Sequence, residues 1–286
     1  MNDPNAMIGD RLKSAEFQSQ WDADFANTMQ SLEAGIVVRL IMSAPLVTVE
    51  ASAVVSDFLD SDANAYLDCF PVRDAAEQVI GAVYRHDHPD RSAAAEQVMR
   101  PLYAVPIVSS AESVDRLMRR MHETGEHYWL VVHGSAIAGI VTRSDLGRLP
   151  VRMLLIMRII HLEELLKTLI RTRVAGDTWL NCLSESRQAK LREVYRSNQM
   201  HGDDLDLLEC TYLSDKATVA RKQLGMAKIE KMIRGIDGLR NQLMHARDGK
   251  TEDASISKLL ERVVRLDKAI ELLQLTIHNA EHGGDD

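Results

Sequence analysis

The chain has 286 residues, 45% hydrophobic and 27% charged, so it is long enough for about two globular domains and its composition excludes disordered and fibrous classes. Its 34 Lys and Arg against 42 Asp and Glu give a net charge of −8, and only 5% of residues are aromatic, which argues against a broad basic face or a stacking platform for nucleic acid. The charge is uneven, however: residues 1–150 hold 12 basic and 21 acidic residues, whereas residues 152–250 hold 18 and 13, a local excess of +5.

The N-terminal segment, residues 1–39, is predicted to be helical. It lacks the basic and apolar regions of a secretion signal. The most apolar stretch of the chain, residues 151–162, contains two arginines and is too short to cross a bilayer. We therefore expect a cytoplasmic protein with no membrane partner. The cysteines form no CxxC pair, so we expect buried thiols rather than disulfides or a metal site at Cys69, Cys182 and Cys210.

A repeat occupies residues 40–150. Shifting the first copy (about 40–97) by 58 residues places it on the second (about 98–150) without gaps. The shift aligns Phe70-Pro71-Val72 with Tyr128-Trp129-Leu130, and Gly81-Ala82-Val83-Tyr84-Arg85-His86-Asp87 with Gly139-Ile140-Val141-Thr142-Arg143-Ser144-Asp145. A fixed period of this size indicates two copies of one supersecondary unit.

The second copy predicts the element order βαββα. A short strand at 105–108 precedes a helix over 110–122, which Ser110 is placed to cap. Strands at 128–132 and 137–141 form a hairpin, because a turn sequence separates two β-branched and aromatic runs. A second helix is expected to begin near Arg143.

These residues resemble the CBS domain, a module that works as a tandem pair. The ligand motif of that family is Gly, two apolar residues, Ser or Thr, two variable residues and Asp, and here it is Gly139-Ile140-Val141-Thr142-Arg143-Ser144-Asp145. The motif closes a strand and opens a helix, where free N–H groups and the helix dipole favour a phosphate. The resemblance implies that the pair binds an adenine nucleotide (AMP, ADP or ATP) as a regulatory ligand.

Within this motif, the Thr142 hydroxyl suits a phosphate and the Asp145 carboxylate suits ribose hydroxyls. By resemblance, Gly139 belongs to the same site, and the adenine contacts the second copy at Val105, Ile107, Leu130 and Val131. The first copy retains Asp87 but has Tyr84 at the Thr position, so its site is expected to be empty or altered. The alternative for the whole repeat is a dimerisation module that binds no ligand.

From residue 151 to about 280 the hydrophobic pattern has the helical period, which predicts an all-α bundle. Pro150 suits the first turn of its first helix. Later helices are expected at about 184–199, 204–223, 226–247 and 254–279, before an acidic tail at 281–286. The predicted fold class is therefore α+β, with two βαββα repeats followed by a helical bundle.

The helix predicted from Met226 to His245 carries the most unusual residue of the chain. On a helical wheel its apolar side chains form one stripe, and Arg240 falls inside it. An arginine there is costly unless it is paired or faces water or an anion. Asn241 and His245, four residues apart, lie at the edge of the stripe, with Asp237 one turn earlier.

The sequence Arg240-Asn241-Gln242-Leu243-Met244-His245 resembles the signature of the HEPN domain, and residues 151–280 resemble that domain as a whole. Active members are metal-independent endoribonucleases in which a two-fold dimer brings two signatures together. The resemblance implies that His245 exchanges a proton, that Arg240 stabilises transition-state charge and that Asn241 holds His245 or the RNA. The possible orienting partners are Glu163, Glu164 and Asp237. The expected products carry 2′,3′-cyclic phosphate and 5′-hydroxyl ends, with no catalytic metal required.

The sequence thus predicts an adenine-nucleotide-regulated endoribonuclease that acts on RNA and dimerises through both the CBS pair and the helical domain. By family analogy alone it is a toxin or an antiphage effector. The alternative is a non-catalytic nucleotide-sensing dimer whose helical domain is an interaction module. In that case His245 caps a helix C-terminus and Arg240 pairs with a buried acid.

Overall fold

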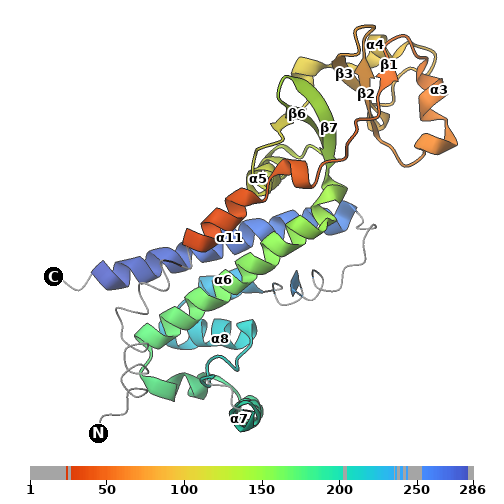
Figure 1. The fold of residues 1–286 in the computed structure, drawn as a ribbon. Helices are drawn as coiled ribbons and strands as arrows, with labels where there is room; N and C mark the ends of the chain where they lie inside the picture. Colours follow the sequence, from red (N-terminus) through yellow and green to blue (C-terminus); the bar gives the residue numbers. More distant parts are fainter. Residues whose placement is uncertain are drawn as a thin grey trace. The chain divides into compact units, whose positions relative to one another are not determined.

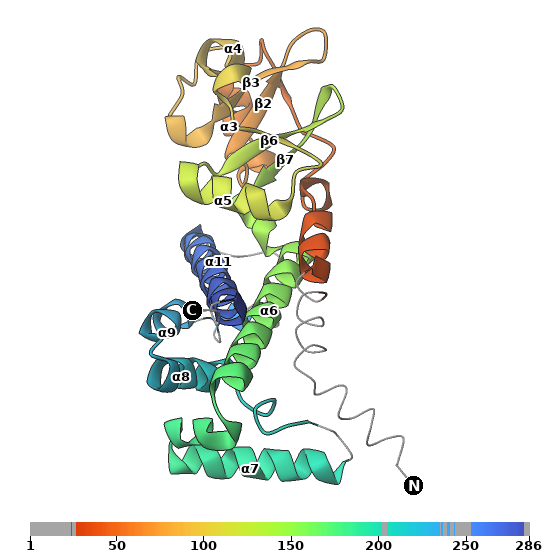
Figure 2. The same ribbon diagram turned by 90° about the vertical axis from the view of Figure 1, so that its left-hand side faces the viewer.

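The structure, a computed structural model, describes residues 24, 27–201, 205–234, 236, 239, 240, 243 and 253–282. They fall into two compact units, whose elements are drawn in Figures 1 and 2. We call residues 33–151, with the described residues of 248–257, the sheet unit, and the described residues of 1–32, 152–247 and 258–286 the helical unit. Three predicted site residues lie outside the described residues, namely Asp237, Asn241 and His245. Most of the predicted segment 1–39 and residues 283–286 of the predicted tail also lie outside them.

The sheet unit contains two small sheets. The first has the order β1-β2-β3-β4, with β1 parallel to β2 and the other neighbours antiparallel. The second has the order β5-β6-β7, with β5 parallel to β6 and an antiparallel β6–β7 hairpin. The strands are β1 Val49–Glu50, β2 Cys69–Arg73, β3 Val79–Tyr84, β4 Arg100–Pro101, β5 Ile107–Ser109, β6 Tyr128–His133 and β7 Ala136–Thr142. Together with the helical remainder of the chain, they confirm the predicted α+β class.

Short helices join these strands. They are α3 Val55–Leu59, α4 Ala95–Val98 and α5 Val114–Thr124, with 3₁₀ turns η1 Val38–Leu40, η2 Asp62–Asn64, η3 Arg85–Asp87, η4 Leu102–Ala104 and η5 Arg143–Gly147. The predicted cap at Ser110 is wrong, because the Ser113 hydroxyl accepts the Arg116 N–H at 3.3 Å and begins α5. Ser110 is buried instead, 2.9 Å from the ring of His133.

The gapless alignment of the two copies is wrong by one residue over part of its length. Val49 pairs with Val72 in the first sheet, and the matching pair in the second sheet is Val108 with Val131, 59 residues later. The hairpins absorb the difference, since the turn between β2 and β3 is longer than the turn between β6 and β7. Phe70 therefore matches Trp129 rather than Tyr128, and the ligand motifs keep the separation of 58.

Each copy is completed by the segment that leads into the other one. β4, which leads into the second copy, pairs with β3 of the first. Ser43, which leads into the first copy, bridges to Ile140 of the second. A Cβ atom on Gly139 would lie 2.7 Å from the Ser43 carbonyl oxygen, so this glycine permits the close approach of the two chains. The strand β4 and the Ser43–Ile140 bridge thus connect the two copies through backbone hydrogen bonds.

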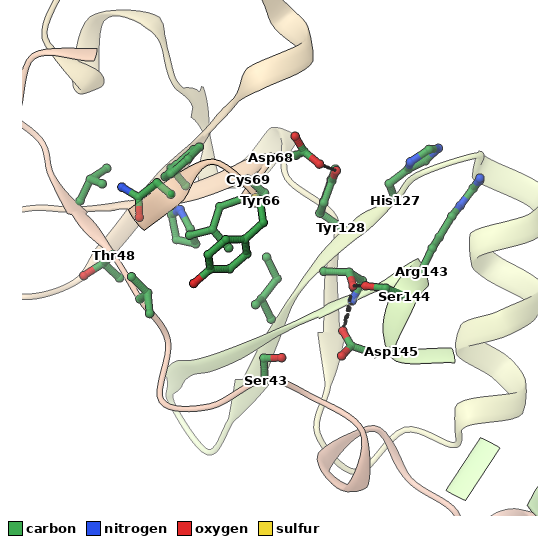
Figure 3. A pocket seen from close by; sticks show the side chains of 18 of the residues that line it. Ser43, Thr48, Tyr66, Asp68, Cys69, His127, Tyr128, Arg143, Ser144 and Asp145 are labelled. Atoms are coloured by element: carbon green, nitrogen blue, oxygen red, sulfur yellow. Dashed lines mark hydrogen bonds between the residues drawn. The ribbon is translucent and has the colours of Figure 1, made fainter. Parts of the chain in front are cut away.

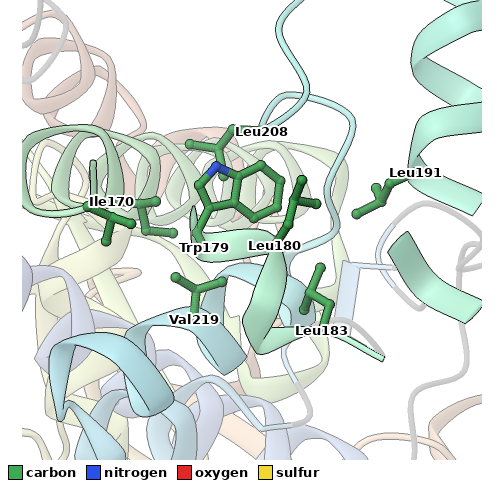
Figure 4. Close-up of a cluster of buried hydrophobic side chains, with 8 residues drawn as sticks. Ile170, Trp179, Leu180, Leu183, Leu191, Leu208 and Val219 are labelled. Atoms are coloured by element: carbon green, nitrogen blue, oxygen red, sulfur yellow. The ribbon is translucent and has the colours of Figure 1, made fainter. Parts of the chain in front are cut away.

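The helical unit comprises α6 Leu149–Arg173, which begins in the last residues of the sheet unit, and then η6 Gly176–Cys182, α7 Glu185–Met200, α8 Leu213–Leu224, α9 Ala227–Ile233 and α11 Asp253–His282. One of its clusters of buried side chains contains Ile170 of α6, Trp179 and Leu180 of η6, Leu191 of α7 and Val219 of α8 (Figure 4). These elements pack because their apolar side chains in the cluster are removed from water. Among the described helices, none has an apolar run long enough to span a membrane.

Two predicted helices differ from the structure. The helix predicted over 204–223 begins only at Leu213, because Asp206 and Glu209 form a reciprocal turn: each side chain accepts the backbone N–H of the other at 2.9 Å. The helix predicted from Met226 ends at Ile233, since Arg234 has a non-helical ψ of 118°. A helical wheel drawn from Ile229 therefore does not extend to Arg240.

Candidate functional site

A cavity of about 650 Å³ lies within the sheet unit, and both copies of the repeat contribute to it. The second copy supplies the end of β7 and the turn η5, with Thr142, Arg143, Ser144 and Asp145. The first copy, with the segment that leads into it, supplies apolar side chains, which we call the apolar wall, and polar ones. The apolar wall is Pro45, Val47, Val49, Leu67, Phe70 and Pro71, and the polar and thiol side chains are Ser43, Thr48, Asn64, Tyr66, Asp68 and Cys69. Figure 3 shows the labelled side chains around this space. A volume of this size and a lining that combines apolar and polar side chains suit a small organic ligand.

Asp145 is the most constrained side chain of the polar wall. It is only 6% exposed, and its carboxylate accepts the Thr142 N–H at 2.7 Å and the Thr142 hydroxyl at 2.9 Å. Its other oxygen lies 2.7 Å from the Arg148 guanidinium. Burial raises the pKa of the Asp145 carboxyl, and these hydrogen bonds oppose that change. The contacts hold the carboxylate at the cavity in a fixed orientation.

Two arginines add positive charge to this wall, and Arg148 is the one that pairs with Asp145. Arg148 donates to the Met42 carbonyl at 3.1 Å and to the Ser43 hydroxyl at 2.8 Å, so it also fixes the segment that completes the second sheet. Arg143 donates to the Gly125 carbonyl at 2.9 Å and lines the cavity. This wall therefore combines hydroxyls, a carboxylate and two guanidinium groups within one turn of chain.

The structure brings together only part of the predicted nucleotide site. Thr142 and Asp145 line the cavity, whereas Val105, Ile107, Leu130 and Val131 are not among its lining residues. Val105 and Leu130 are buried instead in a cluster with residues of the first copy, Cys69, Ala82 and Tyr84. Gly139 is also outside the lining, where it permits the approach of Ser43. The apolar side chains that do line the cavity come mainly from β1, β2 and the segments before them in the first copy.

The matching position in the first copy is filled by the protein itself. Tyr84 is buried, and the Arg100 guanidinium lies 4.5 Å from the centre of its ring. Arg100 also donates two hydrogen bonds to Asp87, at 2.7 and 2.5 Å, which hold the pKa of that carboxyl below its usual range. Asp87 is thus paired with Arg100, and unlike Asp145 it does not line the cavity described above.

Cys69 lies at this cavity, and burial raises its pKa to about 12. The thiol of an unfolded chain titrates near pH ~8.5, so the stability from the buried, protonated thiol is complete below that pH and is lost as the pH rises toward 12. We predict that iodoacetamide at pH 8.5 alkylates Cys69 of the folded chain at least tenfold more slowly than Cys182, since the thiolate is the reactive species. Cys182, which is only partly buried, is the internal control. Equal rates, measured by peptide mass analysis, would contradict the prediction.

All three thiols are free, but only Cys69 is buried, so the expectation of buried thiols is wrong for Cys182 and Cys210.

A second candidate site lies in the helical unit. Arg240 is both exposed and paired, which are the conditions that the sequence required of an arginine in the stripe: its side chain is 53% exposed, and its guanidinium lies 3.5 Å from the Glu163 carboxylate. The apolar side chains that were expected beside it are buried, at Ile229, Ile233, Ile236, Leu239 and Leu243. Glu164 pairs with Lys167 at 2.7 Å rather than with Arg240. Glu163 is therefore the predicted orienting residue that the structure places beside Arg240.

Comparison with known proteins identifies part of the chain. The family model of the CBS domain matches residues 95–151. Solved structures with similarity include the CBS domain of a bacterial CNNM/CorC family Mg²⁺ transporter in complex with ATP, at 20% identity and a TM-score of 0.35 over 44% of this chain and 94% of that chain. Another is CBSX2 in complex with AMP, at 20% identity and a TM-score of 0.36 over 41% and 98%. A third is the CBS domains of a transcriptional regulator from Streptococcus pneumoniae, at 22% identity and a TM-score of 0.35 over 39% and 96%. No curated protein matches the chain. The family model places a CBS domain at residues 95–151, which include the whole motif from Gly139 to Asp145.

Proposed function

We propose that the sheet unit binds an adenine nucleotide (AMP, ADP or ATP) as a regulatory ligand. The observation that supports this most directly is the cavity in which the Thr142–Asp145 turn faces an apolar wall from the first copy. Asp145 is held where its oxygens can accept from ribose hydroxyls, Thr142 and Ser144 offer hydroxyls to a phosphate, and the apolar wall suits a base. The match of residues 95–151 to the CBS domain supports the same ligand class.

Nucleotide titration of the full chain by calorimetry tests this proposal. Asp145→Ala is expected to weaken binding at least tenfold, because a hydrogen bond to a charged group contributes about 1.5–3 kcal/mol. Thr142→Val removes a hydroxyl without emptying a buried position, and it is expected to weaken binding severalfold. The matched control is Asp87→Ala, which removes the equivalent carboxylate of the first copy and is expected to bind within threefold of wild type.

Two results would overturn the nucleotide proposal. One is the failure of AMP, ADP and ATP to bind the wild-type chain. The other is equal affinity of wild type and the folded Asp145→Ala and Thr142→Val variants. Asp145 also pairs with Arg148, so its removal could disturb the fold. Circular dichroism of each variant therefore checks that it is folded.

We propose further that the helical unit is a metal-independent endoribonuclease of the HEPN type, active as a homodimer. The supporting observation is that the Arg240 side chain is 53% exposed to solvent, with its guanidinium 3.5 Å from the Glu163 carboxylate. The exposed guanidinium would be available to a phosphodiester, whereas its pairing with Glu163, whose side chain is 19% exposed, also agrees with the alternative in which Arg240 pairs with a buried acid. Arg240 would stabilise transition-state charge and His245 would exchange the proton. RNA cleavage without added metal is the measurement that tests this role.

A nucleotide bound at the Asp145 turn would control RNA cleavage through α6, the helix that follows this turn in the chain. The turn η5, which carries Asp145, ends at Gly147, and α6 starts at Leu149 and continues to Arg173. A nucleotide can shift the equilibrium between two arrangements only by binding one of them more tightly. We propose that α6 is the element whose placement the ligand biases. If RNA is not cleaved, the chain is a nucleotide-sensing dimer whose helical unit is an interaction module.

A further inference from the structure

One aromatic side chain at the cavity is exposed although it lines the site. Tyr66 lies between η2 and β2, and it is 79% exposed. Figure 3 shows its ring among the side chains that line the cavity. An aromatic ring this exposed gains little from its present contacts, so it has most of its apolar area still to bury.

The backbone on both sides of Tyr66 is fixed. The Arg85 guanidinium donates to three carbonyls, those of Leu59 at 2.9 Å, Asn64 at 3.0 Å and Leu67 at 3.0 Å. The Asn64 amide donates to the Phe58 carbonyl at 3.0 Å, and the Leu67 N–H donates to the Asn64 carbonyl at 2.9 Å. The main chain at Tyr66 is therefore held in place, while its ring makes few contacts.

The segment is also tied to the second copy. The Asp68 carboxylate accepts a hydrogen bond from the Tyr128 hydroxyl at 3.1 Å, and both residues line the cavity. A ring on a fixed main chain loses only two side-chain torsions when it packs on a ligand, so its ordering costs little. This combination is typical of an aromatic anchor in a binding site.

We infer that Tyr66 stacks on the base of the bound nucleotide and makes the site selective for ligands that carry an aromatic base. This inference rests on the proposed nucleotide site. The polar turn at Thr142–Asp145 would hold the ribose and phosphate, and the ring of Tyr66 would cover one face of the base against the apolar wall from the first copy. Stacking between a base and an aromatic side chain is worth roughly a tenfold or greater change in affinity.

The test compares ligands with and without a base. AMP and ribose 5-phosphate are titrated by calorimetry into the full-length wild type, Tyr66→Phe and Tyr66→Ala. Tyr66→Phe is expected to bind AMP as wild type does, whereas Tyr66→Ala binds it about tenfold more weakly. The affinity for ribose 5-phosphate is expected to be the same in all three. The control is Tyr103→Ala, which removes another tyrosine, 93% exposed and outside the cavity lining.

The outcomes separate this inference from the nucleotide proposal. If AMP binds wild type, is weakened by Asp145→Ala and is unaffected by Tyr66→Ala, the role of Tyr66 is wrong and the nucleotide site stands. An equal loss of AMP and ribose 5-phosphate affinity in Tyr66→Ala also overturns the stacking role, because the ring would then support the loop rather than the base. If wild type binds no nucleotide, both proposals fail.

Discussion

Arg240→Ala and His245→Ala are expected to cleave RNA at least a hundredfold more slowly than the wild-type chain. General acid–base catalysis by a positioned side chain contributes roughly 10²- to 10⁴-fold, and loss of a group that stabilises transition-state charge costs a comparable factor. The measurement is cleavage of labelled RNA in EDTA, with and without AMP, ADP or ATP. The products are expected to carry 2′,3′-cyclic phosphate and 5′-hydroxyl ends.

The matched control for Arg240 is Arg234→Ala, which removes another exposed cation at the end of α9. It is expected to retain activity within a fewfold, because a general loss of positive charge weakens RNA binding only modestly. The nuclease role would be excluded if the wild-type chain cleaved RNA no faster than Arg240→Ala and His245→Ala do. This result would have to hold under every nucleotide condition. The non-catalytic nucleotide sensor would then be the function to pursue.

Arg158→Met is expected to lower the free energy of unfolding by about 3–5 kcal/mol, because it removes the guanidinium that compensates the charge of the largely buried Asp267 carboxylate. Arg158 of α6 and Asp267 of α11 form an ion pair of 2.7 Å with side chains only 4% and 11% exposed. The measurement is urea unfolding of the full chain followed by far-ultraviolet circular dichroism. The two helices belong to the helical unit, so the loss is expected in the transition of its helices.

A double variant distinguishes loss of the pair from loss of packing. Arg158→Met with Asp267→Leu removes both charges and is expected to recover most of the lost stability, since apolar replacements of a buried pair are often neutral. Arg265→Met is the control on α11, because its pair with Glu261 is more than half exposed and contributes little. The explanation would be wrong if the double variant were as unstable as Arg158→Met alone.

The sequence predicts the polar turn of the ligand site but not its apolar wall. The motif from Gly139 to Asp145 is local, because consecutive residues at the end of a strand share one turn, and Thr142 and Asp145 do meet at the cavity. The apolar wall is not local. It comes from Val47, Leu67 and Pro71 of the first copy. The family resemblance places the adenine on the copy that carries the motif, at Val105, Ile107, Leu130 and Val131, but Val105 and Leu130 belong to the core and none of the four lines the cavity.

The sequence by itself determined the α+β class, the repeat, the motif at the end of β7 and the helical character of the second half, because each depends on patterns within a few neighbouring residues. Only the tertiary structure decided the one-residue shift in the repeat, the closure of the Tyr84 position by Arg100 and the exposure of Arg240. The helical wheel placed Arg240 in an apolar stripe because it assumed a continuous helix, and Arg234 ends α9 before that residue. Interactions between residues far apart in the chain, such as Arg240 with Glu163 and Arg100 with Asp87, decide which polar side chains are paired and which remain available to a ligand.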